Sequence, residues 1–155
     1  MLQRIQSVFL AIVSLAMGVY LVTPTWMKSS PTEQVRLNAF ALIHTQGDKT
    51  LHDTNTIYLS ILAIIAACVA LFSVFQYHNR LRQMMLGMVN SLVMVVLLGL
   101  SVYNSFQGGS YFEPAQRGNY AIGFYAIAVG LIANVLANRF IRRDEQKVRD
   151  ANRMR

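Results

Sequence analysis

Charged residues are scarce in this chain, and so is cysteine. Asp, Glu, Lys and Arg together make up only 14% of the 155 residues, whereas 54% are hydrophobic. Since about 25% of the residues in a soluble globular domain are charged, this composition excludes an ordinary soluble fold. Cys68 is the only cysteine, which excludes an intrachain disulfide, and its apolar surroundings indicate a small packing residue.

Four apolar stretches carry almost no charge and have nearly the length of a membrane span. They cover residues 5–22, 57–75, 84–103 and 120–140, and their only charged side chain is Arg139. A bilayer's hydrocarbon core is about 30 Å thick, so a helix needs roughly 20 apolar residues to cross it. Open strands would leave backbone groups unpaired in lipid, and four segments are too few for a closed barrel. The sequence therefore predicts one domain over residues 1–155, an all-α membrane protein built as a bundle of four transmembrane helices.

The first apolar stretch also has features of a cleaved signal peptide. Arg4 precedes it, and small residues stand at Ser14 and Ala16 with the spacing of a cleavage site. Because the apolar run continues to Val22, we expect the segment to be retained as an anchor.

The basic residues are distributed unevenly between the two sides of the predicted bundle. Lys and Arg accumulate in cytoplasmic connections. With four spans, ten of the fourteen fall on one side, which predicts that both termini and the connection 76–83 are cytoplasmic. The ten are Arg4, Arg80, Arg82, Arg139, Arg142, Arg143, Lys147, Arg149, Arg153 and Arg155.

The first outer connection, residues 23–56, is too long for an unstructured loop. Apolar residues alternate over residues 34–45, which predicts a strand, and residues 46–49 form a turn before a short second strand at 50–52. We therefore expect a small β-sheet or hairpin that caps the outer end of the bundle. The second outer connection, residues 104–119, contains Gly108, Gly109 and Pro114 and is expected to be irregular.

Asn90 and Asn134 are the strongest polar groups inside the predicted spans. Each lies six residues from the cytoplasmic end of its span, so at 1.5 Å per residue both sit about 9 Å inside the boundary. They predict an interhelical hydrogen bond, or else a polar contact to a quinone, a lipid or a transported solute.

Small residues recur at four-residue spacing, which lets helices approach closely in lipid. The pairs include Gly87 with Ser91 and Ala126 with Gly130. They predict packing within the bundle or an interface with another membrane subunit.

The chain offers no convincing catalytic, cofactor or metal site. His44 and His52 share the outer connection with Asp48 and Asp53, but their spacing lacks a tight pair of metal ligands. We expect them to be solvated surface residues, and we expect a protein that is not an enzyme and has no cofactor.

The residues after the last span are strongly basic. Such clusters attract anionic lipid at about 1 kcal/mol per charge. Docking to an acidic partner or to ribosomal RNA is the alternative, but no aromatic residues interleave the charges as base stacking requires, so we expect no nucleic acid. The basic tail covers residues 141–155. We expect five basic residues, in this tail and at the end of the preceding span, to contact lipid or a partner: Arg139, Arg142, Arg143, Lys147 and Arg149.

Both ends of the chain carry recognisable motifs, MLQRIQS at residues 1–7 and RRDEQKVR at residues 142–149. With PTW at residues 24–26 before the long outer connection, they make the chain resemble an uncharacterised family of small four-helix inner-membrane proteins of Bacteroidota. That resemblance implies a bacterial inner-membrane address and assigns no activity or catalytic residue.

The functional expectation follows from the surfaces that the chain would present. We expect an accessory or scaffold subunit of a larger inner-membrane complex, contacting membrane lipids, anionic lipid at the cytoplasmic face, and other membrane-protein subunits. The alternative is a small homo-oligomeric transporter or channel lined by Asn90, Ser91 and Asn134.

Overall fold

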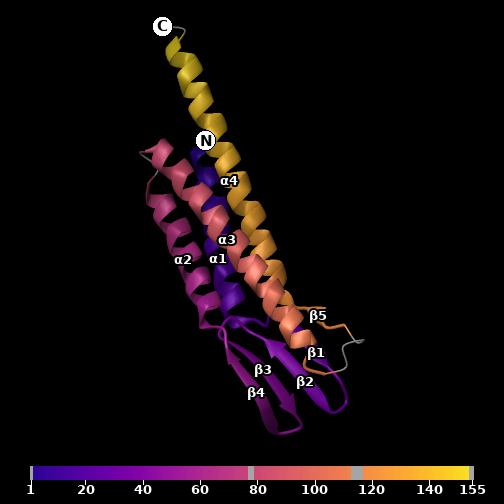
Figure 1. The fold of residues 1–155 in the computed structure, drawn as a ribbon. Coiled ribbons are helices and arrows are strands. Elements are labelled where there is room, and N and C mark those ends of the chain that lie inside the picture. Colours follow the sequence, from indigo (N-terminus) through magenta and orange to yellow (C-terminus); the bar gives the residue numbers. More distant parts are fainter. Residues whose placement is uncertain (1, 77–78, 113–116, 154–155) are drawn as a thin grey trace.

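The computed structural model describes residues 2–76, 79–112 and 117–153 and contains four helices and five strands in these ranges (Figure 1). The sheet lies at one end of the helix bundle, and the described chain begins and ends at the opposite end (Figure 1). The helices are α1 (Leu2–Val22), α2 (Ile57–Phe75), α3 (Arg80–Gly109) and α4 (Ile122–Arg153). The strands are β1 (Trp26–Ser29), β2 (Glu33–Leu37), β3 (Ala41–Gln46), β4 (Lys49–Asn55) and β5 (Asn119–Tyr120).

The four helices pack as a closed bundle in which α1 contacts α2 and α4, while α3 contacts α2 and α4. Phe9 of α1 stacks on Phe140 of α4 with ring centroids 5.6 Å apart. Large apolar side chains from three helices fill the centre of the bundle, among them Met17, Met94 and Ile127, each fully buried. The interior is therefore a packed core.

The distribution of side-chain sizes in α2 is the reverse of that in a soluble helix. Its buried residues include Ser60, Ala63, Ala66, Ala70 and Ser73, with Leu59 as a large apolar member, whereas most of its other large apolar residues point outward. Exposed apolar faces of this extent normally mark a binding surface or contact with lipid, and small residues at the interior let helices approach closely in a membrane. The outward residues include Ile61, Ile64, Ile65, Leu71 and Phe72, which are 43–55% exposed.

Three helices of the described chain are long and apolar enough to cross a membrane: residues 57–75, 81–109 and 122–146. The described side chains of α1 form a shorter apolar helix of 17 residues, Gln6–Val22. These lengths are consistent with a membrane protein. Both α3 and α4 extend beyond the predicted spans 84–103 and 120–140, and the predicted inner turn at 76–83 includes residues 77–78, outside the described residues.

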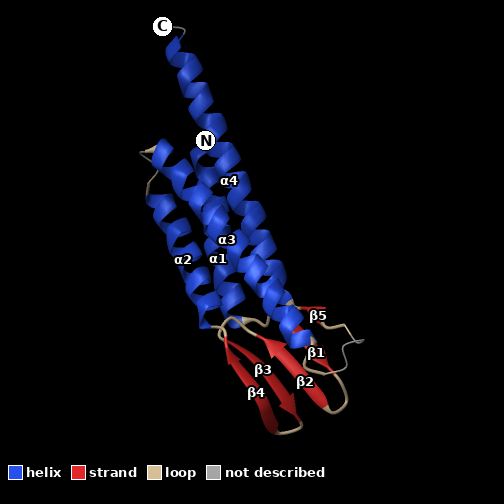
Figure 2. Ribbon diagram, viewed as in Figure 1, coloured by secondary structure: helices blue, strands red, loops and turns tan. Residues whose placement is uncertain are grey.

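The expectation of an all-α protein is wrong, because the cap is a five-stranded antiparallel sheet rather than a small sheet or hairpin within a helical fold (Figure 2). Its strand order is β4-β3-β2-β1-β5. Strand β5 joins the last residue of the second outer connection, Asn119, to Tyr120, which was expected to begin the fourth span, and pairs Tyr120 with Trp26. The two outer connections therefore build one sheet together.

The single strand expected over residues 34–45 is also wrong. The chain turns at residues 38–40, where the Asn38 N–H donates to the Ala41 carbonyl at 2.9 Å, and β2 and β3 pair as neighbours. Alternation continues through the turn in the sequence, so periodicity alone hides it. The following turn contains Gly47 at φ 55°, a backbone conformation that glycine adopts without steric cost.

The last turn of α3 rests on the buried face of the sheet at Gly108. A β-carbon there would lie 3.0–3.2 Å from side-chain atoms of Trp26, Val35 and Leu42. At the other junction, the Gly123 N–H of α4 donates to the Pro24 carbonyl at 2.9 Å. These two contacts fix the cap against the end of the bundle.

Gly123→Ala should destabilise the junction, because the new β-carbon would lie 2.8 Å from the carbonyl oxygen of Pro24, a backbone atom that cannot rotate away. Overpacking of this kind costs about 1–3 kcal/mol. The matched control is Gly99→Ala in α3, where a β-carbon meets nothing within 4 Å. Unfolding by SDS in mild-detergent micelles should show a lower free energy of unfolding for Gly123→Ala alone. Equal stability of the two variants would contradict this packing.

Candidate functional site

The strongest polar contact inside the bundle joins α3 to α4. The Asn134 amide donates to the Gly87 carbonyl and to the Ser91 hydroxyl, both at 2.8 Å. The Asn90 amide reaches the Asn134 side-chain oxygen at 3.5 Å, the outer limit for a hydrogen bond. Asn90 and Asn134 are 1% and 0% exposed, so the cluster is enclosed between the two helices.

The small residues singled out in the sequence lie at close helix approaches within the chain. A β-carbon on Gly87 would lie 2.0 Å from the side-chain oxygen of Asn138, and one on Gly130 would lie 2.8 Å from the methyl carbon of Met94. Ala126 is 9% exposed. These faces of α3 and α4 are therefore occupied by each other and by α1.

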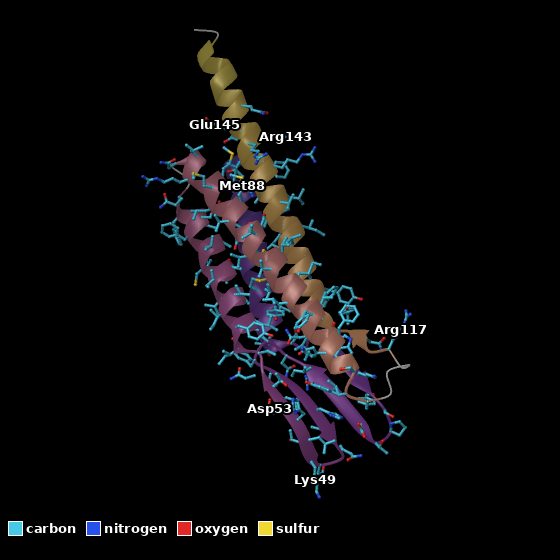
Figure 3. All side chains as sticks on the ribbon, viewed as in Figure 1. Lys49, Asp53, Met88, Arg117, Arg143 and Glu145 are labelled. Atoms are coloured by element: carbon cyan, nitrogen blue, oxygen red, sulfur yellow. The ribbon has the colours of Figure 1, made fainter. Side chains whose placement is uncertain are left out.

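The basic residues of α4 begin where the helix leaves the bundle. Arg139, Arg142 and Arg143 are exposed, and an Arg142 guanidinium nitrogen lies 3.7 Å from the sulfur of Met88. Arg143 and Glu145 mark the start of the projecting segment (Figure 3). Lys147 and Arg149 belong to α4, but their side chains lie outside the described part of the chain.

Lys28 of β1 is buried at the carboxyl end of α3. Its ammonium group donates to the Gly109 carbonyl at 2.9 Å and to the Phe112 carbonyl, and it lies 4.5 Å from the centre of the Phe112 ring. Only 2% of the residue is exposed. A cation at this position balances the negative end of the helix dipole and satisfies terminal carbonyl groups.

His44 is also buried, at 7% exposure, and is not the solvated surface residue that the sequence suggested. Its Nε2 atom lies 2.9 Å from a Glu33 carboxylate oxygen, and its ring stacks on both Tyr111 and Phe112. His52, its cross-strand neighbour, is exposed and contacts the edge of the Tyr111 ring. The carboxylate that faces His44 is therefore Glu33, which pairs with Gln46 in the register of β2 and β3.

A groove of about 490 Å³ lies between the end of α3 and the segment that enters β5. Small-molecule sites typically enclose about 300–1,000 Å³ and are lined by aromatic groups with a few polar ones. This groove has that character, since Ser105 and Ser110 lie beside three aromatic residues and one arginine. The remaining lining residues are Trp26, Phe106, Gly109, Arg117, Gly118 and Tyr120.

A second hollow, of about 420 Å³, opens on the other side of Arg117. It is lined in part by Lys28, Arg36 and Asn119. Among the described residues, no group of three or more His, Cys, Asp or Glu side chains is arranged to hold a metal ion.

Comparison with known proteins gives a family without an assigned activity. The model of the domain of unknown function DUF4293 matches residues 2–154, nearly the whole chain. The chain belongs to this family. No curated protein matches it in sequence.

In this DUF4293 protein, sequence reasoning missed Lys28, Glu33, Trp26 and Arg117 as members of a site. Lys28 and Arg117 were counted only as outer charges, although Lys28 lies two residues after Trp26 on one face of β1. In a strand, residues two apart share a face, so the position of Lys28 relative to Trp26 could have predicted that this lysine is buried. Nothing local linked Arg117 to Trp26, because β5 has only two residues.

Asn134 and Ser91 should be energetically coupled, because their side chains hydrogen-bond across α3 and α4. A double-mutant cycle of Asn134→Ala and Ser91→Ala, measured by SDS unfolding in mixed micelles, should give a coupling of roughly 0.6 kcal/mol, up to about 1.7. Strict additivity of the two losses would show that this bond does not stabilise the bundle.

Lys28→Met should destabilise the protein strongly, since it leaves the Gly109 and Phe112 carbonyls without their cation. Hydrogen bonds to charged groups contribute about 1.5–3 kcal/mol. Lys49→Met on exposed β4 is the matched control and should change stability by no more than about 0.5 kcal/mol. The same unfolding assay tests both, and a similar small effect at the two positions would refute the role of Lys28.

Proposed function

We propose that this protein is a non-enzymatic accessory or scaffold subunit of a larger complex in the bacterial inner membrane. In this proposal the chain crosses the membrane four times, both termini are cytoplasmic and the sheet faces outward. The proposal rests on two properties of the molecule, a bundle of apolar helices and a folded cap in which β4 forms one edge of the sheet.

The arrangement of the helices supports four crossings. Helix α1 has 21 residues, which at 1.5 Å each give about 32 Å, similar to the roughly 30 Å of a hydrocarbon core. It packs along α2 and α4, both long enough to span. The exposed arginines of α4 lie at the end remote from the sheet, as positive-inside orientation requires.

The observation that carries the proposal is the free edge of β4. This seven-residue strand is the last in the sheet order on its side, and six of its residues are exposed. The backbone groups on such an edge can pair with an added strand, a common mode of partner recognition. Leu51 stands at 51% exposure between Lys49 and Asp53, so the edge offers an apolar contact flanked by both charges.

The alternative transporter is less well supported. Its pathway between protomers would be lined by Asn90, Ser91 and Asn134, yet Asn90 and Asn134 are enclosed between α3 and α4 of one chain. Their hydrogen bonds are made within the bundle, which favours a packing role.

The proposal predicts a stoichiometric partner that depends on the β4 edge. Purification of the full chain from native membranes in mild detergent should recover the partner, and Leu51→Glu should reduce its recovery severalfold by placing a charge at the centre of the edge. Met27→Glu is the control, because Met27 is an exposed apolar residue of the same sheet, at 43%, but lies on β1.

Two results together would reject the accessory role. One is a clean monomer without any copurifying subunit. The other is a deletion strain in which every inner-membrane complex assembles normally. Flux through liposomes that contain only this protein would instead support the transporter.

A further inference from the structure

The groove beside Trp26 has walls suited to an amphiphile. Aromatic rings of Trp26, Phe106 and Tyr120 form its apolar part, and Phe106 is 73% exposed. The ring of Trp26 lies directly against the backbone of Gly118, where a β-carbon would approach to 2.1 Å. The absence of a side chain at Gly118 thus lets the aromatic wall and the chain segment leading to β5 close on each other.

The electrostatics of the groove favour an anion. Arg117 is its only charged residue among those described, and it is exposed. The carboxyl end of α3 would ordinarily repel an anion. Here Lys28 holds the Gly109 carbonyl, so the negative pole of the helix next to the groove is already balanced.

The groove lies at the level where the apolar helices end. The Tyr58 hydroxyl, at the start of α2, donates to the Asn104 side chain at 2.9 Å. Asn104 of α3 therefore lies level with the cap-side end of α2. Beyond it, α3 continues to Gly109, and Tyr103 and Phe106 are exposed on this extension. Exposed aromatic rings are enriched at the membrane–water interface. Arg117 projects outside the bundle on the cap side (Figure 3).

We propose that this groove binds the headgroup region of an anionic phospholipid from the leaflet on the cap side. The phosphate lies against the Arg117 guanidinium, and the adjoining glycerol and first part of the acyl chains lie on the exposed rings of Phe106 and Tyr120, beside the buried ring of Trp26. A free phosphate ester would use Arg117 but leave the aromatic wall empty, so the wall favours the lipid. The inference requires only that the chain sits in a membrane, and it is independent of any partner subunit.

Trp26 makes this binding directly measurable, because it is the only tryptophan of the chain. The full chain is reconstituted in phosphatidylcholine vesicles that contain increasing fractions of a lipid with brominated acyl chains, which quench tryptophan fluorescence at short range. Brominated phosphatidylglycerol should quench Trp26 at a severalfold lower mole fraction than brominated phosphatidylcholine does. Arg117→Gln should make the two lipids equivalent.

Arg36→Gln is the matched control, since Arg36 is an exposed arginine of the same cap that lines only the neighbouring hollow. It should keep the preference for phosphatidylglycerol. An unchanged Trp26 emission maximum and unchanged quenching by phosphatidylcholine verify that each variant is folded. For a variant that fails this check, Arg117→Lys retains the charge and should retain a measurable preference.

Three outcomes would overturn the inference. The first is equal quenching by the two lipids in the unaltered protein. The second is a preference that survives in folded Arg117→Gln. The third is loss of the preference on adding millimolar glycerol phosphate, which would assign the site to a soluble phosphate ester. Failure to copurify a partner would not change any of these three quenching results. The lipid site and the accessory role are therefore tested separately.

Discussion

The ammonium group of Lys28 at the carboxyl end of α3 joins the two parts of the molecule. Lys28 is only 2% exposed, and burying an ammonium group costs free energy unless its N–H groups find hydrogen-bond acceptors. The Gly109 and Phe112 carbonyls are those acceptors. Because Gly109 is the last residue of α3, Phe112 follows it closely and Lys28 belongs to the sheet, these hydrogen bonds hold the cap against the end of α3. Gly108 has no side chain, which lets the end of α3 approach the buried face of the sheet closely.

The bundle and the cap follow different packing rules. In α2 small and hydroxyl side chains are buried and most of the large apolar ones face outward, the pattern expected of a helix in lipid, where an exposed Ile or Phe carries no cost. In the cap, large residues such as Trp26, Leu37 and Leu42 are buried, and the outward positions of β1 and β2 are mostly polar. Helix α3 bridges both regimes by passing from an apolar span into contact with the sheet.

The sequence was informative where one side chain or one local pattern decides the outcome. Length and lack of charge define α2 by themselves, and Asn90 and Asn134 could be placed at equal depth from helical rise alone. The five-stranded sheet was not accessible in the same way. Its β5 strand has two residues whose conformation depends on pairing with Trp26, far away in the chain. The pairing of His44 with Glu33 likewise requires the turn at residues 38–40, which periodicity hides.

The two ends of the molecule present different kinds of surface to their surroundings. At the remote end, Arg139, Arg142 and Arg143 are exposed along one helix, and such a surface attracts anionic partners without selecting their shape. In the cap, Lys28 and His44 contact groups of the same chain, so both side chains contribute to the fold. The outer surface of the cap has two shaped features, the edge strand β4 and the aromatic groove beside Arg117. Because shape discriminates between partners more finely than an exposed run of like charge does, both proposed binding sites, for a partner strand and for a lipid headgroup, are assigned to the cap rather than to the basic end of α4.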